Sequence, residues 1–388
     1  MTHPWLDAWR SAGMEPQLVP CGAGHLLTSM RGARAIPLDE DGRPLLWVSP
    51  ALQPTPAGAP GAARALTERD WNTGGERLWL APEIRFMIHD RRDFDGSYEL
   101  PPAMDPGAWA ADRSEPGCFR QTLELVARDS NERLQLDVVQ RLAPAADPLR
   151  RGAPSTADPL RRGAPSAADA LRQGAPSAAD SLRPRAPRPV VRHLGWTREV
   201  RLQRTASDGG TVPCQAWVIA QVPAGGVAWV PGGAGARLTD YFEPIDDAHR
   251  KRGAEHLSLR VDGRRRYKVG VRSGEHRGQL LYWREADGHE LGEDRAYLYL
   301  RRFLDLPSSR YLEQPPALAD HEGDSAYVYN DDGRHGDFGE LEVLGRALEP
   351  HQPTVADLFE MHVWWGPTNE VAEVARAWLG ADWYPTQA

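Results

Sequence analysis

Short runs of alternating apolar and polar residues recur along this 388-residue chain, separated by turns rich in Gly, Pro and Asp. Neighbouring side chains of a strand point to opposite faces, so this alternation is typical of a half-buried strand. The segment 133–139, Arg-Leu-Gln-Leu-Asp-Val-Val, shows the pattern clearly. The runs that predict strands are 121–127, 133–142, 198–204, 215–222, 267–272, 279–284, 296–303, 326–329, 339–344 and 358–365. Their spacing favours a mainly β protein, a large antiparallel β-sandwich.

Helical periodicity is confined to the two ends of the chain. Near the C-terminus, Thr368 is expected to act as the N-cap of a helix and Gly380 to end it. The apolar face of this helix is expected to consist of Val371, Val374, Ala375, Trp378 and Leu379. A short helix over 4–11 would bury Trp5 and Trp9. Both helices are expected to pack on the sandwich.

A tandem repeat with a period of eleven residues interrupts the strand pattern. Asp147, Asp158, Asp169 and Asp180 mark its successive copies. Nearly every copy carries Gly and Pro, which break helices, and one Leu as its large apolar residue, too little to offset the entropy of ordering. We expect 144–189 to be a disordered insertion, and 1–143 and 190–388 to form a single sandwich domain.

Composition and motifs exclude several classes of protein. The formal net charge of −8 argues against binding nucleic acid through the whole surface. No apolar run approaches the ~18 residues of a membrane helix, and the N-terminus lacks a secretory signal, so a cytoplasmic protein that does not bind membranes is expected. Cys21, Cys118 and Cys214 form no disulfide framework. No nucleotide-binding or metal-ligand motif is present, and we expect neither a cofactor nor a metal. The oligomeric state is left open.

Three charged residues on predicted strands are candidates for chemistry. Glu340 and Glu342 are two residues apart and point to the same face, where they repel each other unless cations or solvent compensate them. They form either a solvated face or a general base with a neighbouring carboxylate. Lys268 is one of only two lysines in a chain that otherwise uses Arg, and it lies on an apolar strand. A compact ammonium is required there, or the lysine is there by chance.

A double glycine at 74–75 precedes another candidate segment. It permits a tight turn or a close approach of the backbone to a ligand. Arg77, Trp79 and Glu83 follow it, and His89 comes soon after. The segment is either a surface turn before a core strand or part of a binding site.

The order of several segments resembles the galactose mutarotase-like superfamily, in an aldose 1-epimerase-like branch. The resemblance spans 17–366, with the repeat as an addition. It rests on Arg31-Gly-Ala-Arg-Ala-Ile-Pro-Leu, Asp41-Gly-Arg-Pro-Leu-Leu-Trp-Val, Gly74-Gly-Glu-Arg-Leu-Trp-Leu-Ala-Pro-Glu, Trp217-Val-Ile-Ala-Gln-Val, Tyr267-Lys-Val-Gly-Val-Arg and Gly339-Glu-Leu-Glu-Val-Leu-Gly. It implies a β-supersandwich with a sugar site on a concave sheet face.

The resemblance also implies an activity and roles for the candidate residues. In aldose 1-epimerases a glutamate in a Leu-Glu strand motif takes the proton of the anomeric hydroxyl. That motif matches Leu341-Glu342 and makes Glu342 the expected base, with Glu340 as second choice. A histidine protonates the ring oxygen in those enzymes, but the corresponding segment, 212–217, contains none. Lys268 and His89 are therefore the candidates for the acid.

Substrate contacts are expected from Arg77, which would hold sugar hydroxyls, and from Trp79, Glu83 and His89. The implied function is the interconversion of sugar anomers by acid–base ring opening, with a small carbohydrate as the partner. The alternatives are a non-catalytic carbohydrate-binding protein on the same fold and a relative of polysaccharide lyases or hydrolases.

Overall fold

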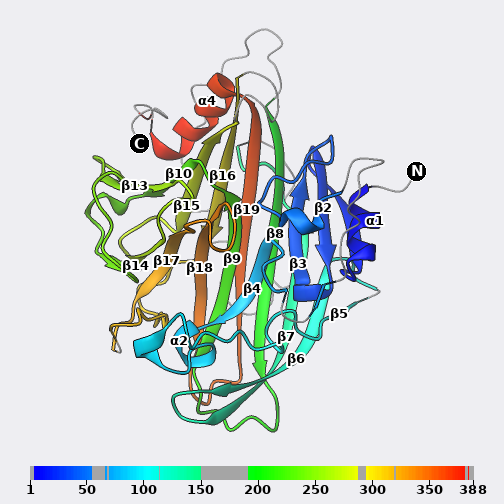
Figure 1. Ribbon diagram of the computed structural model, residues 1–388, viewed down its shortest axis with the longest axis vertical. Coiled ribbons are helices and arrows are strands. Elements are labelled where there is room, and N and C mark those ends of the chain that lie inside the picture. The colour runs from blue at the N-terminus through cyan, green and yellow to red at the C-terminus, as the bar shows by residue number, and fades with distance from the viewer. Residues whose placement is uncertain are drawn as a thin grey trace.

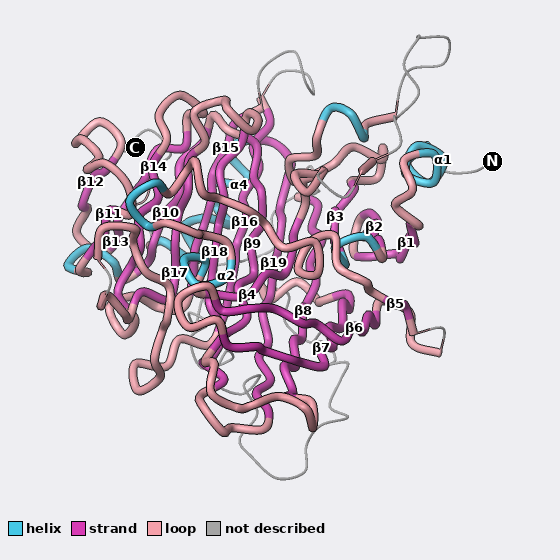
Figure 2. The backbone as a smooth tube through the Cα atoms, turned by 60° about the horizontal axis from the view of Figure 1, so that its bottom comes forward, coloured by secondary structure: helices cyan, strands magenta, loops and turns pink. Residues whose placement is uncertain are grey.

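The computed structural model describes residues 4–54, 66–67, 70–112, 114–149, 191–286, 294–318, 320–380 and 383. Its strands form two large antiparallel sheets, and helices are few (Figure 1, Figure 2). The predicted antiparallel β-sandwich with a C-terminal helix is therefore confirmed. Most of the repeat, 150–190, lies outside the described residues. Its disorder, and the assignment of 1–143 and 190–388 to one domain, stay predictions.

The first sheet has nine strands. They are β1 (Pro16–Cys21), β2 (Gly24–Ser29), β3 (Arg34–Leu38), β4 (Glu76–Ala81), β9 (Cys214–Pro223), β11 (Leu238–Asp240), β14 (Tyr267–Arg272), β17 (Asp324–Asn330) and β18 (Phe338–Leu348). Their spatial order is β1-β2-β3-β4-β9-β18-β17-β14-β11. Strands from both halves of the chain therefore lie side by side at the centre of this sheet.

The second sheet has ten strands. They are β5 (Ala110–Ala111), β6 (Cys118–Ala127), β7 (Glu132–Pro144), β8 (Arg192–Arg204), β10 (Gly226–Pro231), β12 (Arg250–Arg252), β13 (His256–Val261), β15 (Gln279–Glu285), β16 (Arg295–Phe303) and β19 (Thr354–Pro367). Their order is β12-β13-β10-β15-β16-β19-β8-β7-β6-β5. Each of the ten strands predicted from the alternation lies within an observed strand. The shorter strands, such as β3 and β11, are too brief to show a period.

Among the described residues, the α-helices are α1 (Pro4–Ser11), α2 (Glu83–Phe86) and α4 (Thr368–Leu379). Helix α1 buries Trp5 and Trp9 as expected and lies beside β2, while α4 lies near β10 and β16 (Figure 1). The expected N-cap was wrong by one residue: Thr368 is the first helical residue, and Pro367 precedes it with no side-chain cap. Strand β19 runs into Pro367, whose ring fixes φ and starts the helix directly.

Cys21, Cys118 and Cys214 are buried free thiols. No helix in the described ranges is long and apolar enough to cross a membrane.

A buried group of charges joins the two sheets and fixes which face of β4 points inward. Glu76 of β4 pairs with Arg198 of β8 at 2.6 Å and with Arg301 of β16 at 2.7 Å, and all three side chains are fully buried. Burial opposes ionisation of Glu76, but the two guanidinium groups outweigh it and hold its pKa below the ordinary value. Because alternate residues of a strand face opposite ways, Arg77 and Trp79 point away from the second sheet.

Candidate functional site

Strand β18 places Glu340 and Glu342 on the outer face of the first sheet. An added Cβ on Gly339 would meet Val261 of the second sheet, so Gly339 and Leu341 face inward and the two glutamates face outward. Glu342 lies opposite Ile219 of β9 and Tyr327 of β17. The same-face pair predicted from the sequence is thus present, at the centre of the sheet.

Lys268 of β14 forms the centre of the site. Its Nζ lies 3.1 Å from Oε2 of Glu342, 3.8 Å from Oε1 of Glu313 and 4.0 Å from Oε2 of Glu83. Only 4% of the Lys268 side chain is exposed. An ammonium so enclosed needs opposite charges close by to offset the loss of its hydration.

Aromatic rings complete the surroundings of this ammonium. Nζ of Lys268 lies 4.3 Å from the ring centroid of Trp217, 5.0 Å from that of Tyr327 and 5.3 Å from that of Tyr241. The negative faces of aromatic rings attract cations at such distances. Three rings and three carboxylates therefore share one lysine.

Glu340 has a different cation. Nη2 of Arg77 donates to its Oε1 at 2.7 Å, and Nε2 of Gln221 donates to the same oxygen at 3.0 Å. The Arg77 guanidinium also lies 4.2 Å from the ring centroid of Trp79. Nε and Nη1 of Arg77 and Oε1 of Gln221 are buried and have no hydrogen-bond partner among the described residues. These atoms can serve the hydroxyl groups of a ligand.

Glu313 is the member of the site that sequence reasoning missed. It lies in the loop between β16 and β17, where Oε2 accepts a hydrogen bond of 2.7 Å from the backbone N–H of Glu83. A glutamate in a loop has no strand periodicity that could predict its orientation. The sequence signal that could have pointed to Glu313 is the apolar pair Tyr311 and Leu312 just before it, which is buried and holds this loop against the sheet.

The charges shift each other's titration. Burial raises the pKa of Glu342 to about 7; Lys268 opposes this rise and Glu340 adds to it. Burial likewise raises the pKa of Glu313 to about 8, opposed by Lys268 and assisted by Glu83. Burial also raises the pKa of Glu83. Burial would lower the pKa of Lys268, but the carboxylates, with Glu342 first, overcome this and raise it. The lysine is therefore charged at neutral pH, next to two carboxyl groups that titrate near neutrality.

Two indole groups donate hydrogen bonds to carboxylates in and next to the site. Nε1–H of Trp217 donates to Oε2 of Glu342 at 2.9 Å. Nε1–H of Trp79 donates to Asp105 at 2.9 Å, and Arg34 holds the same carboxylate. Trp79 and Trp217 meet edge to face, with ring centroids 5.7 Å apart. Trp79 and Trp217 thus serve as hydrogen-bond donors beside the site, which accounts for part of the high tryptophan content.

His89 lies apart from this group. It is exposed, and its ring contacts Glu99 at 2.6 Å and Arg128 at 3.0 Å. The structure therefore brings together Arg77, Trp79, Glu83, Lys268, Glu340 and Glu342, and places His89 in a surface ion-pair group.

Loops cover the site. Asp95 pairs with Arg266 at 2.7 Å and with Arg334 at 3.4 Å, and Nδ2 of Asn72 donates to the backbone oxygen of His335. The side chains of Glu313 and Glu342 are each only 1% exposed. The structure therefore leaves these two carboxyl groups almost without access to solvent.

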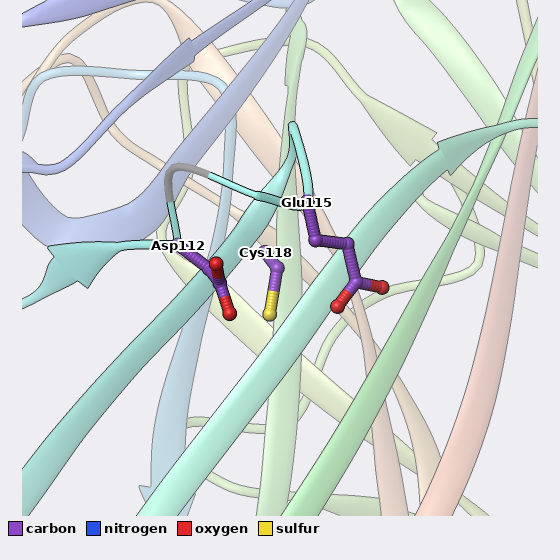
Figure 3. Close-up of side chains that lie close together, drawn as sticks. All are labelled: Asp112, Glu115 and Cys118. Carbon is purple, nitrogen blue, oxygen red and sulfur yellow. The ribbon is translucent and has the colours of Figure 1, made fainter.

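A second acidic cluster occurs at the turn between β5 and β6. Ligand atoms of Asp112, Glu115 and Cys118 lie within 4.8 Å of one another (Figure 3). Asp112 already accepts hydrogen bonds from Ser114, and Glu115 pairs with Arg141 at 2.9 Å. Burial raises the pKa of the Cys118 thiol, which keeps it protonated. The cluster is explained by these local contacts.

Comparisons with known proteins find likeness in structure alone. No family model matches the chain, and no curated protein matches it. A candidate aldose 1-epimerase from Escherichia coli K12 has a similar structure, with 12% identity and a TM-score of 0.46, over 91% of this chain and 100% of that one.

The chain is also similar to a GH36 α-galactosidase from Geobacillus stearothermophilus in complex with stachyose, at 10% identity and a TM-score of 0.32. The same enzyme with raffinose gives 11% and 0.31. In both cases 90% of this chain is covered and 40% of that chain.

Proposed function

We propose that this chain is a carbohydrate-active enzyme of aldose 1-epimerase type, which interconverts the anomers of a sugar without a cofactor. The observation that carries the proposal is the pair Glu342 and Glu313, whose carboxyl oxygens lie 3.1 Å and 3.8 Å from Nζ of Lys268 on the outer sheet face. Both titrate near neutrality, as a general base and a general acid must.

The base is Glu342 and the acid is Glu313. The Glu342 carboxylate takes the proton of the anomeric hydroxyl, and the electrons of that O–H bond form the aldehyde C=O. The bond between the anomeric carbon and the ring oxygen breaks, and the ring oxygen takes its electron pair and a proton from Glu313. Rotation about the adjacent C–C bond and the reverse steps close the ring on the other face, which restores both residues.

The remaining residues hold the two carboxyl groups and the sugar. Lys268 stays charged, so it positions Glu342 and stabilises negative charge instead of donating a proton. Oε2 of Glu313 is occupied by the backbone N–H of Glu83, which leaves Oε1 to carry the proton. The free donors of Arg77 would bind sugar hydroxyls, with Trp79 beneath it.

The test measures the rate of anomer exchange for a panel of sugars by NMR saturation transfer. We expect exchange above the uncatalysed rate for at least one sugar, and its loss in Glu342→Gln and Glu313→Gln. The matched control is Glu99→Gln, the same change on an exposed glutamate outside the site. A wild-type exchange rate in Glu342→Gln would contradict the assignment of Glu342 as the base.

A second candidate function is carbohydrate binding without turnover. The near-complete burial of Glu313 and Glu342 favours it, because turnover needs both groups in contact with the sugar and each is only 1% exposed. This alternative predicts sugar-dependent thermal stabilisation, lost in Arg77→Met, with no exchange for any sugar. Exchange catalysed by the wild-type chain and lost in Glu342→Gln would exclude it.

A further inference from the structure

The buried charges between the two sheets do not balance. Within the described part of the chain, this group has one carboxylate, Glu76 of β4, and two guanidinium groups, Arg198 of β8 and Arg301 of β16. None of the three side chains has exposed surface. The neighbouring Arg34 has its own counter-charge, because Asp105 lies 2.6 Å from it. The group between the sheets therefore carries one positive charge without a counter-charge.

The ion pair of Glu76 and Arg198 is complete in itself. Nε of Arg198 donates to Oε1 of Glu76 at 2.6 Å, and Nη2 donates to the backbone oxygen of Glu76 at 3.3 Å. Nη1 of Arg198 donates to the backbone oxygen of Ala33 at 3.3 Å and to Oε1 of Gln140. All three nitrogens of Arg198 thus have acceptors, and the excess positive charge resides on Arg301.

Arg301 lacks acceptors for its hydrogen bonds. Its Nη1 lies 2.7 Å from Oε2 of Glu76, but neither this nitrogen nor Nε or Nη2 has a hydrogen-bond partner among the described residues. Burial lowers the pKa of Arg301; Glu76 opposes this fall and Arg198 adds to it. A guanidinium has five N–H groups, and leaving them unsatisfied in the core is costly. Arg301 therefore needs an additional acceptor that is negatively charged.

The position of Arg301 limits what this acceptor can be. Arg302, the next residue of β16, faces outward, with its guanidinium 5.9 Å from the ring centroid of Trp378 of α4, so Arg301 faces the space between the sheets. On that inner face it lies opposite Leu280 of β15 and Met361 of β19, which are both buried and apolar. The acceptor must therefore be small, carry one negative charge and bring no donor of its own that needs a partner.

We propose that a chloride ion binds between the two sheets on the guanidinium of Arg301 and forms a structural anion site. The ion accepts N–H groups of Arg301 and supplies the counter-charge that Glu76, shared with Arg198, does not supply. A divalent anion such as phosphate would reverse the imbalance instead of removing it. This inference does not rest on the proposed function, and its tests measure stability and diffraction, not anomer exchange.

The first experiment measures Tm against sodium chloride concentration at pH 7, with the ionic strength kept constant by sodium methanesulfonate. An ion that binds the folded state alone stabilises it, and for a chain of this size we expect Tm to rise by roughly 2 °C for each tenfold increase in chloride above its dissociation constant. A Tm that does not change when chloride replaces methanesulfonate overturns the inference.

The second experiment removes the excess charge. Arg301→Met leaves Glu76 paired with Arg198 alone, and its Tm should no longer depend on chloride. The matched control is Arg302→Met on the opposite face of the same strand, where Arg302 pairs with Glu360 at 2.7 Å. This variant should be less stable than the wild type but keep the wild-type chloride dependence. Retention of that dependence in Arg301→Met contradicts the assignment to Arg301.

The third experiment needs no variant, so it decides the question even if Arg301→Met does not fold. Crystals of the wild-type chain are grown in sodium bromide, because bromide replaces chloride and scatters X-rays anomalously. We expect an anomalous peak in contact with the Arg301 guanidinium. Water in place of a halide there overturns the inference. A peak without any chloride dependence of Tm also overturns it, since the ion then binds at crystal concentration only.

Discussion

The ammonium of Lys268 pairs with Glu342, although the sheet register aligns Lys268 with Glu340. Lys268 and Glu340 both lie opposite Tyr329, whereas Glu342 is two residues further along β18. Arg77 already occupies Glu340 at 2.7 Å, so the lysine reaches diagonally to Glu342 at 3.1 Å. Each of the two repelling carboxylates thus has its own cation, which satisfies the requirement inferred from their spacing.

The first prediction concerns the pH dependence of anomer exchange. Catalysis needs Glu342 deprotonated and Glu313 protonated, with pKa values raised to about 7 and about 8. The rate should therefore rise through pH 7, pass a maximum between these values and fall above pH 8. NMR exchange rates measured from pH 5 to 10 check the profile. A rate independent of pH across this range contradicts the pair.

The second prediction concerns Lys268→Met. Without the ammonium, the buried carboxyl groups Glu83, Glu313 and Glu342 lose their shared cation, and breaking a buried ion pair costs about 3–5 kcal/mol. We expect lower stability in urea unfolding at pH 8 and lost exchange. The other lysine of the chain offers the control, since Lys251 is exposed and Lys251→Met should behave as wild type. Wild-type stability of Lys268→Met would show that the lysine is dispensable.

Sequence periodicity predicts which side chains share a face, and this is why Glu340 and Glu342 could be grouped before the structure was known. It does not predict which strands become neighbours. Lys268 joins the glutamates because β14 lies one strand beyond β17, a long-range pairing that the local pattern does not determine.

Site residues that loops contribute are harder still to predict from the sequence. Glu313 enters the site on a segment without secondary structure, and its role depends on a backbone contact with Glu83. His89 shows the converse limit. It follows the double-glycine strand closely in sequence, but the chain turns at α2 and carries it to the surface beside Arg128.

The third prediction concerns stability and pH. The folded pKa of Glu313 is raised from an ordinary value of 4.5 to about 8, so the folded state binds more protons than the unfolded state between these values. The free energy of unfolding contributed by this group is full below pH 4.5 and is lost as the pH rises toward 8. Glu313→Gln should flatten the decline of Tm from pH 5 to 8. An identical slope in the variant and the wild type counts against the shift.

The fourth prediction concerns the charges between the sheets. Glu76→Gln leaves Arg198 and Arg301 buried without a counter-charge, and this should cost about 3–5 kcal/mol in urea unfolding. Glu132→Gln, on an exposed residue that begins β7, is the control and should change stability little. A small effect in Glu76→Gln would mean that the two arginines find other compensation.

The fifth prediction separates positioning from packing at Trp217. Its indole N–H donates to the ionised Glu342 carboxylate at 2.9 Å, and removing a donor from the charged form raises a carboxyl pKa. In Trp217→Phe the rising limb of the pH–rate profile should move to higher pH by up to about one unit, the effect of about one hydrogen bond. Trp229→Phe, an equally buried change in the second sheet, should leave this limb in place. A lower rate with an unmoved limb in Trp217→Phe would assign Trp217 to packing alone.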